Sequence, residues 1–122
     1  MSLCLVAAGK TAVLAVSAFT LSWTHSVEKV EWREHYAVTP AGLVLTEAAV
    51  KGSGAGMEPG DGAVLREGWW VWRPDRKPLP KLDLAASGAT VSDWQLCHAD
   101  GCLDLGKAAG ADTQIMPCSR TP

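Results

Sequence analysis

The chain has 122 residues and a formal charge of −2, a size that suits one domain with one modest core. This mixed charge excludes an electrostatic footprint for nucleic acid or for an anionic membrane surface. The apolar residues near the N-terminus are too short and too interrupted to span a bilayer, which needs about 20 residues.

The N-terminal residues contain two apolar runs, Leu3 to Ala8 and Thr11 to Phe19, on either side of Gly9-Lys10. The second run follows a lysine and loosely resembles a secretory signal, but a signal needs positive charge where this chain has its first apolar run. We favour two strands that meet at Gly9-Lys10, with no leader. That interpretation implies a cytoplasmic location, and a periplasmic one is the alternative.

The strongest pattern is a hairpin between Thr11–Ser26, one long bent strand, and Val30–Val38. Apolar residues alternate with polar ones in both runs, which is typical of half-buried strands. With the bend at Glu28-Lys29, the hairpin places Phe19 opposite Val38, Leu21 opposite Tyr36, Trp23 opposite Glu34, and His25 opposite Trp32. Nearly every large apolar side chain then shares one face. His25 and Glu34 are the ionisable exceptions on it.

Turn chemistry separates the remaining apolar runs into further short strands. They are Leu43 to Val50 (with residues 47–49 also compatible with a helix), Val64-Leu65, Trp69 to Trp72, Leu82 to Ala86, Trp94 to His98, Cys102 to Leu105 and Thr113 to Cys118. About eight short strands predict an all-β fold, either a small antiparallel β-barrel or a β-sandwich. We expect a single domain over residues 1–118 and a short polar tail at 119–122.

The tryptophans are unusual, because the chain has six of them against one phenylalanine and one tyrosine. Trp69 and Trp70 must face opposite ways if they lie on a strand. One of those faces is therefore exposed or lines a groove.

A loop with five glycines runs from Gly52 to Gly62. It is neither a phosphate loop nor a dinucleotide fingerprint, because it lacks the lysine and the glycine spacing that those motifs need. Its backbone amides could form an anion nest, or the glycines could only carry the chain across the end of the fold. The predicted binding residues are Gly52, Ser53, Gly54, Gly56 and Glu58 of this loop, with His25, Ser26, Glu28, Glu34, Trp69 and Trp70.

A histidine beside carboxylates at Glu28 and Glu34 has two interpretations. His25 could act as a general base or metal ligand in a small hydrolase or metal-dependent enzyme. The interpretation that we favour is a buried polar pair that fixes the hairpin register. Ser26 faces away from His25 and makes a poor nucleophile, so we assign no catalytic residue.

Four cysteines allow three states. Cys97 and Cys102 flank a short loop on one face and could form a disulfide or a redox pair that serves as a thiol sensor, while reduced thiols fit equally well. A zinc site from Cys97, His98, Cys102 and Cys118 is disfavoured, because the chain has no Cys-x-x-Cys pair. We therefore predict no cofactor.

The segment Trp23-Thr24-His25-Ser26-Val27-Glu28-Lys29, with Glu34, Gly52 to Pro59 and Gly68-Trp69-Trp70, resembles the domain-of-unknown-function family 1850 (DUF1850). The Cys97–Cys102 hairpin and Cys118 resemble the proteobacterial branch of that family. Members are commonly encoded beside TRAP-type solute transporters of the TAXI class, whose receptors bind small organic acids. The resemblance implies an accessory or binding module whose partners are the membrane subunits or the solute receptor of such an uptake system. It supplies no catalytic residues.

Overall fold

The structure is a computed structural model that describes residues 1–122 except 25–29, 52–59, 61, 85–93, 106–111 and 120–122. The described residues form eleven strands in two antiparallel sheets. This confirms the all-β class. Over the same residues, no helix has the length and apolar character needed to cross a membrane.

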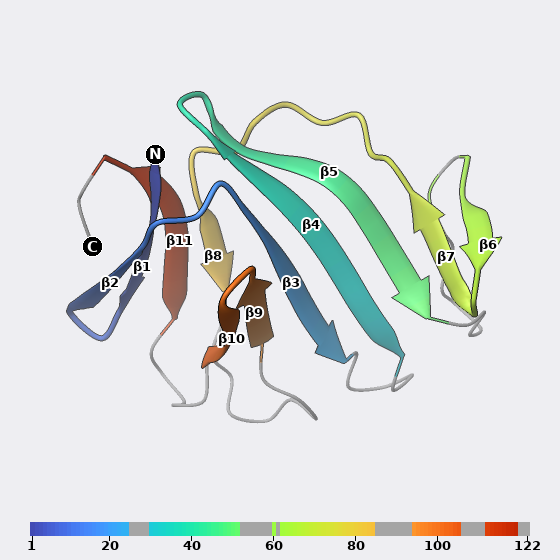
Figure 1. The fold of residues 1–122 in the computed structure, drawn as a ribbon, viewed down its shortest axis with the longest axis horizontal. Helices are drawn as coiled ribbons and strands as arrows, with labels where there is room; N and C mark the ends of the chain where they lie inside the picture. Colours follow the sequence, from blue (N-terminus) through green and yellow to red (C-terminus); the bar gives the residue numbers. More distant parts are fainter. Residues whose placement is uncertain (25–29, 52–59, 61, 85–93, 106–111, 120–122) are drawn as a thin grey trace.

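The smaller sheet brings the two ends of the chain together (Figure 1). Its strand order is β2 (Lys10–Leu14), β1 (Ser2–Ala7), β11 (Thr113–Cys118) and β8 (Leu82–Leu84). The β1–β2 turn lies at Ala8-Gly9, where φ is 50° and 77°. Positive φ at both central residues matches the right-handed twist of a two-residue hairpin. The predicted pair of N-terminal strands is therefore present, with its turn one residue earlier.

The larger sheet has seven strands and curves away from the smaller one (Figure 1). Its order is β10 (Gly101–Leu105), β9 (Trp94–His98), β3 (Ala18–Thr24), β4 (Glu31–Thr39), β5 (Gly42–Lys51), β7 (Trp69–Trp72) and β6 (Val64–Arg66). Each sheet ends in two edge strands, so within the described residues neither closes on itself. The fold is sandwich-like, which was one of the two predicted architectures.

The run from Thr11 to Ser26 is not one bent strand as predicted. Its described residues, up to Thr24, form β2 in the smaller sheet and β3 in the larger, and the chain changes sheets between them. A hydrogen bond from the Val16 amide to the Leu14 carbonyl (3.0 Å) turns the backbone there. The Ser17 carbonyl then accepts from the Val38 amide (2.9 Å), which starts the pairing with β4.

The core lies between the two sheets and is aliphatic with one stacked aromatic pair. Phe19 and Tyr36 stack with ring centroids 5.2 Å apart. The buried cluster consists of Leu3, Leu5, Phe19, Leu21, Tyr36, Val38, Leu43, Leu45, Leu84, Leu96 and Ile115. We call the core-facing side of the larger sheet its inner face and the opposite side its outer face.

The predicted β3–β4 hairpin is present, but the register that we predicted for it is wrong by two residues. Phe19 pairs with Tyr36 instead of Val38. Leu21 pairs with Glu34 instead of Tyr36, and Trp23 pairs with Trp32 instead of Glu34. A shift of two keeps every side chain on its predicted face, since the side-chain period of a strand is two. The observed register places aromatic residues opposite each other at two positions, and both pairs stack.

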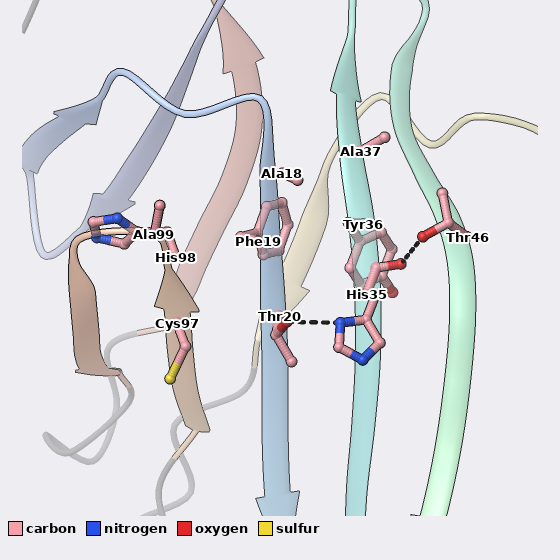
Figure 2. Close-up of a pocket in the computed structure, with 10 residues that line it drawn as sticks. All are labelled: Ala18, Phe19, Thr20, His35, Tyr36, Ala37, Thr46, Cys97, His98 and Ala99. Carbon is pink, nitrogen blue, oxygen red and sulfur yellow. Dashed lines mark hydrogen bonds between the residues drawn. The ribbon is translucent and has the colours of Figure 1, made fainter. Parts of the chain in front are cut away.

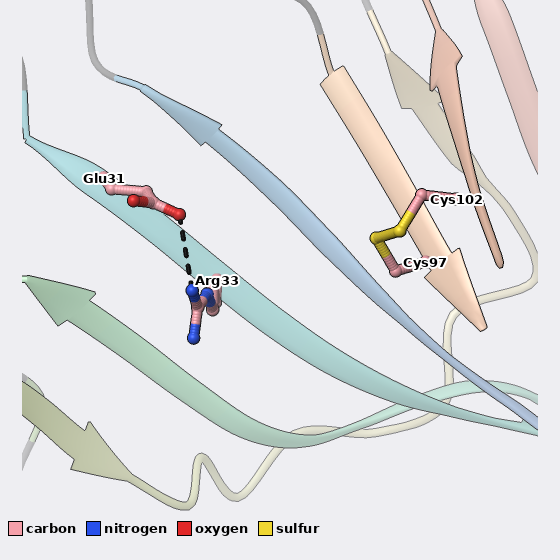
Figure 3. Close-up of polar contacts among 4 residues, drawn as sticks. All are labelled: Glu31, Arg33, Cys97 and Cys102. Atoms are coloured by element: carbon pink, nitrogen blue, oxygen red, sulfur yellow. Dashed lines mark ion pairs between the residues drawn. A yellow bond between two sulfur atoms is a disulfide. The ribbon is translucent and has the colours of Figure 1, made fainter. Parts of the chain in front are cut away.

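Two disulfides join the four cysteines. Cys97 and Cys102 lie opposite each other in the β9–β10 hairpin and are bonded (Figure 3). Cys4 and Cys118 join β1 to β11 across 114 residues of sequence, a bond that sequence reasoning did not anticipate. The zinc alternative has no thiolate ligands here, because its three cysteines are all in disulfides.

The two disulfides should contribute unequally to stability. In the chain-entropy description, closing a loop of more than 100 residues stabilises by about 5 kcal/mol, and closing the hairpin by about 2 kcal/mol. The double variant Cys4→Ala/Cys118→Ala should therefore lose clearly more unfolding free energy than Cys97→Ala/Cys102→Ala in urea denaturation. Equal losses would contradict this account of the Cys4–Cys118 bond.

Candidate functional site

One cross-strand row of apolar side chains runs over the inner face of the larger sheet, beside the buried cluster. We call it the tryptophan row. Its members are Leu105, Trp94, Trp23, Trp32, Val50, Trp70 and Leu65, one from each of the seven strands. Paired register positions join all neighbours except Trp94 and Trp23, whose rings touch with centroids 4.7 Å apart. Side chains in such a row lie close enough to pack on one another.

The rings of this region pack on each other without being fully buried. Trp23 and Trp32 stack with centroids 6.2 Å apart and planes 7° apart. Trp72, one row closer to the core, meets Trp32 edge to face at 6.2 Å and 83°. All four tryptophans of the row and Trp72 are half-buried, whereas Val50 between Trp32 and Trp70 is fully covered. The tryptophan row is thus apolar along its whole length, and its four tryptophans still reach solvent.

Among the described residues of the inner face, Glu34 is the one with a charged side chain. It lies in the row next to the tryptophan row, between the buried Leu21 and Ala48, and Trp72 follows Ala48 in the same row. Its Oε1 accepts a hydrogen bond from the Tyr36 hydroxyl at 2.9 Å. That bond partly offsets the cost of holding a carboxylate among apolar side chains.

The pKa of the Tyr36 hydroxyl reflects this environment. Burial raises the pKa of its hydroxyl far above the ordinary value of 10, and the negative charge of Glu34 and the hydrogen bond to it raise the pKa further. The exposed Arg76 acts in the opposite direction, although less strongly. The hydroxyl therefore stays protonated and remains a donor to Glu34.

Several predicted site residues lie outside the described residues: His25, Ser26, Glu28, Gly52, Ser53, Gly54, Gly56 and Glu58. The expected approach of His25 to Glu34 rested on the wrong register. Glu34 faces Leu21 rather than Trp23.

The described end of the glycine loop approaches Trp72. A Cβ placed on Gly60 would lie 2.3 Å from the indole nitrogen of Trp72, so only glycine allows this close approach. The ring of Trp72 therefore contacts both the loop at Gly60 and Trp32.

Trp69 and Trp70 face opposite sides of the sheet, as predicted from their adjacency. Trp69 lies on the outer face, where the Arg33 guanidinium covers its ring at 4.1 Å and the Lys51 ammonium lies 5.8 Å away. Arg33 also pairs with Glu31 at 3.6 Å (Figure 3). Both charged partners of that pair are more than a third exposed, so it contributes little stability.

A cavity of about 460 Å³ lies on the outer face over β3, β4 and β9 (Figure 2). Thr20 Oγ1 and His35 Nδ1 are 2.7 Å apart in it, and Cys97 contributes to its wall. Thr46, the extra residue of a β-bulge in β5, donates to the His35 carbonyl. Sequence reasoning missed this cavity, since both the Thr20–His35 pairing and the bulge depend on register. No three potential metal ligands gather among the residues that the structure describes.

The comparisons with known proteins identify one relationship. The profile of a family described as "Domain of unknown function (DUF1850)" matches residues 19–105, and the chain therefore belongs to that family. The match spans β3 to β10 and so contains the tryptophan row and Glu34. No curated protein and no solved structure matches the chain.

Tyr36 gives a pH test of the Glu34 site. Because its folded pKa is raised, the stability that it contributes is complete below pH of about 10 and is lost as pH rises above that value. It is the single tyrosine of the chain, so absorbance at 295 nm should show tyrosinate only as the protein unfolds. Tyr36→Phe should flatten the alkaline fall in urea stability. A folded protein that titrates with a midpoint near 10 would disprove the described environment.

Proposed function

We propose that this DUF1850 protein is a binding or accessory module, not an enzyme, that works with a TAXI-class TRAP system for solute uptake. The observation that carries the proposal is the half-exposed tryptophan row on the inner face. Tryptophan is among the side chains most enriched at the energetic centres of binding surfaces.

The composition of the core supports this proposal. The buried cluster contains leucine, isoleucine, valine, phenylalanine and tyrosine, and every tryptophan is only half-buried. The chain thus retains large aromatic surfaces that its own interior does not use fully. The family resemblance gives the partners: the membrane subunits or the organic-acid receptor of the transporter.

We further propose that the protein works in an oxidising compartment, the periplasmic alternative of the sequence analysis. Two disulfides support this, since cytosolic reductants keep structural thiols reduced. Cys4 is 3% exposed and belongs to the packed interior, so its bond to Cys118 is part of the fold and not a surface modification.

Co-purification tests the partner. The full chain, expressed with its TAXI membrane subunits and receptor, should capture at least one of them. Trp70→Leu, on the inner face, should weaken capture at least about tenfold. Trp69→Leu is the matched control, because it removes the neighbouring indole from the outer face of the same strand. Equal loss in both variants, or no capture by the wild type, would refute the proposal.

Thiol trapping tests the compartment. Protein taken from its native cells, with thiols alkylated at lysis, should carry no label and should have an intact mass about four units below that of the reduced chain. Four labelled thiols would place the protein in a reducing compartment instead.

A further inference from the structure

We propose that Trp32, Trp72 and Glu34 form a site for an alkylated ammonium ion, such as the trimethylammonium group of a small solute. The inference rests on the proposed binding function and specifies the chemical class of the ligand.

The three side chains lie together on the inner face. Glu34 and Trp72 occupy one cross-strand row with only the small Ala48 between them. Trp32 is two residues from Glu34 on the same strand and face, and its ring is nearly perpendicular to that of Trp72 (83°, centroids 6.2 Å apart). Two indoles at a right angle beside a carboxylate resemble two walls of an aromatic cage.

The indole rings and the carboxylate of this site both attract cations. The face of an indole ring carries negative potential and attracts cations within about 6 Å, and the Glu34 carboxylate adds a full negative charge nearby. Trp69 on the outer face already has this attraction satisfied by Arg33 and Lys51. In the part of the chain that the structure describes, no lysine or arginine lies over Trp32 or Trp72, and Glu34 forms no ion pair.

Hydrogen-bond capacity favours an alkylated ammonium over a primary one. A primary ammonium has three donors that each need an acceptor when water is excluded. Among the described side chains of the tryptophan row and the row beside it, Glu34 is the acceptor, and its Oε1 already receives the Tyr36 hydroxyl. A quaternary ammonium has no N–H donor to satisfy, and its methyl groups can pack on indole faces while the charge remains.

The test compares two probes of the same shape in titrations of the full chain followed by calorimetry and tryptophan fluorescence. Choline carries the quaternary charge, and 3,3-dimethylbutan-1-ol replaces its nitrogen by carbon. Choline should bind at least about tenfold more tightly than the alcohol. Equal affinities, or no saturable choline binding up to about 10 mM, would overturn the inference. This comparison uses wild-type protein and does not depend on any variant folding.

Variants locate the site. Glu34→Gln and Trp32→Leu should each weaken choline binding at least about fivefold, whereas Trp69→Leu should leave it unchanged. An equal loss in Trp69→Leu would place binding elsewhere and overturn the assignment.

Vesicles of phosphatidylcholine present the same ammonium group on a lipid. Binding to these vesicles without binding to free choline would overturn the proposal that the ligand is a small solute. Transporter capture without choline binding would refute this inference alone, and choline binding without capture would refute only the proposed partners.

Discussion

The register between β3 and β4 determines which residues share each part of the inner face. Pairing Phe19 with Tyr36 and Trp23 with Trp32 places one stacked aromatic pair in the core and the other four residues further along the strands. The neighbouring strands continue both rows, so the tryptophan row exists only because several registers agree. A slip of one residue between β3 and β4 would turn every side chain of one strand to the other face.

The smaller sheet divides the inner face into two parts with different roles. Leu3, Leu5 and Ile115 from β1 and β11 cover the core end, and the Cys4–Cys118 bond ties those two strands together. The tryptophan end keeps partial access to solvent. Stability is therefore concentrated where the chain ends meet, and the candidate binding surface lies where the strands extend beyond that cover. The two parts remain in contact, because Tyr36 of the buried cluster donates to Glu34 and Trp94 packs against the cluster.

Alternation along the sequence was sufficient to predict the strands and the faces of Phe19, Leu21, Trp69 and Trp70, because those properties depend on neighbouring residues only. Register was not predictable, since it depends on how many residues the β3–β4 connection takes. Non-local features were also missed: the division of Thr11–Ser26 between two sheets, the Cys4–Cys118 bond and the bulge at Thr46. Of the predicted binding residues, the structure describes Glu34, Trp69 and Trp70. It separates them, with Trp69 on the opposite face.

Glu34 is the residue that packing alone does not explain. Its cross-strand neighbours are the buried Leu21 and Ala48, and an apolar residue there would avoid the desolvation of a carboxylate. Tyr36 donates one hydrogen bond to Oε1, and the half-buried side chain leaves the second carboxylate oxygen open to water or to a ligand. Residues that are unfavourable for the fold concentrate at functional sites. The tryptophans beside Glu34 favour a partner that is both apolar and positively charged, which links the exception in the packing to the proposed ligand.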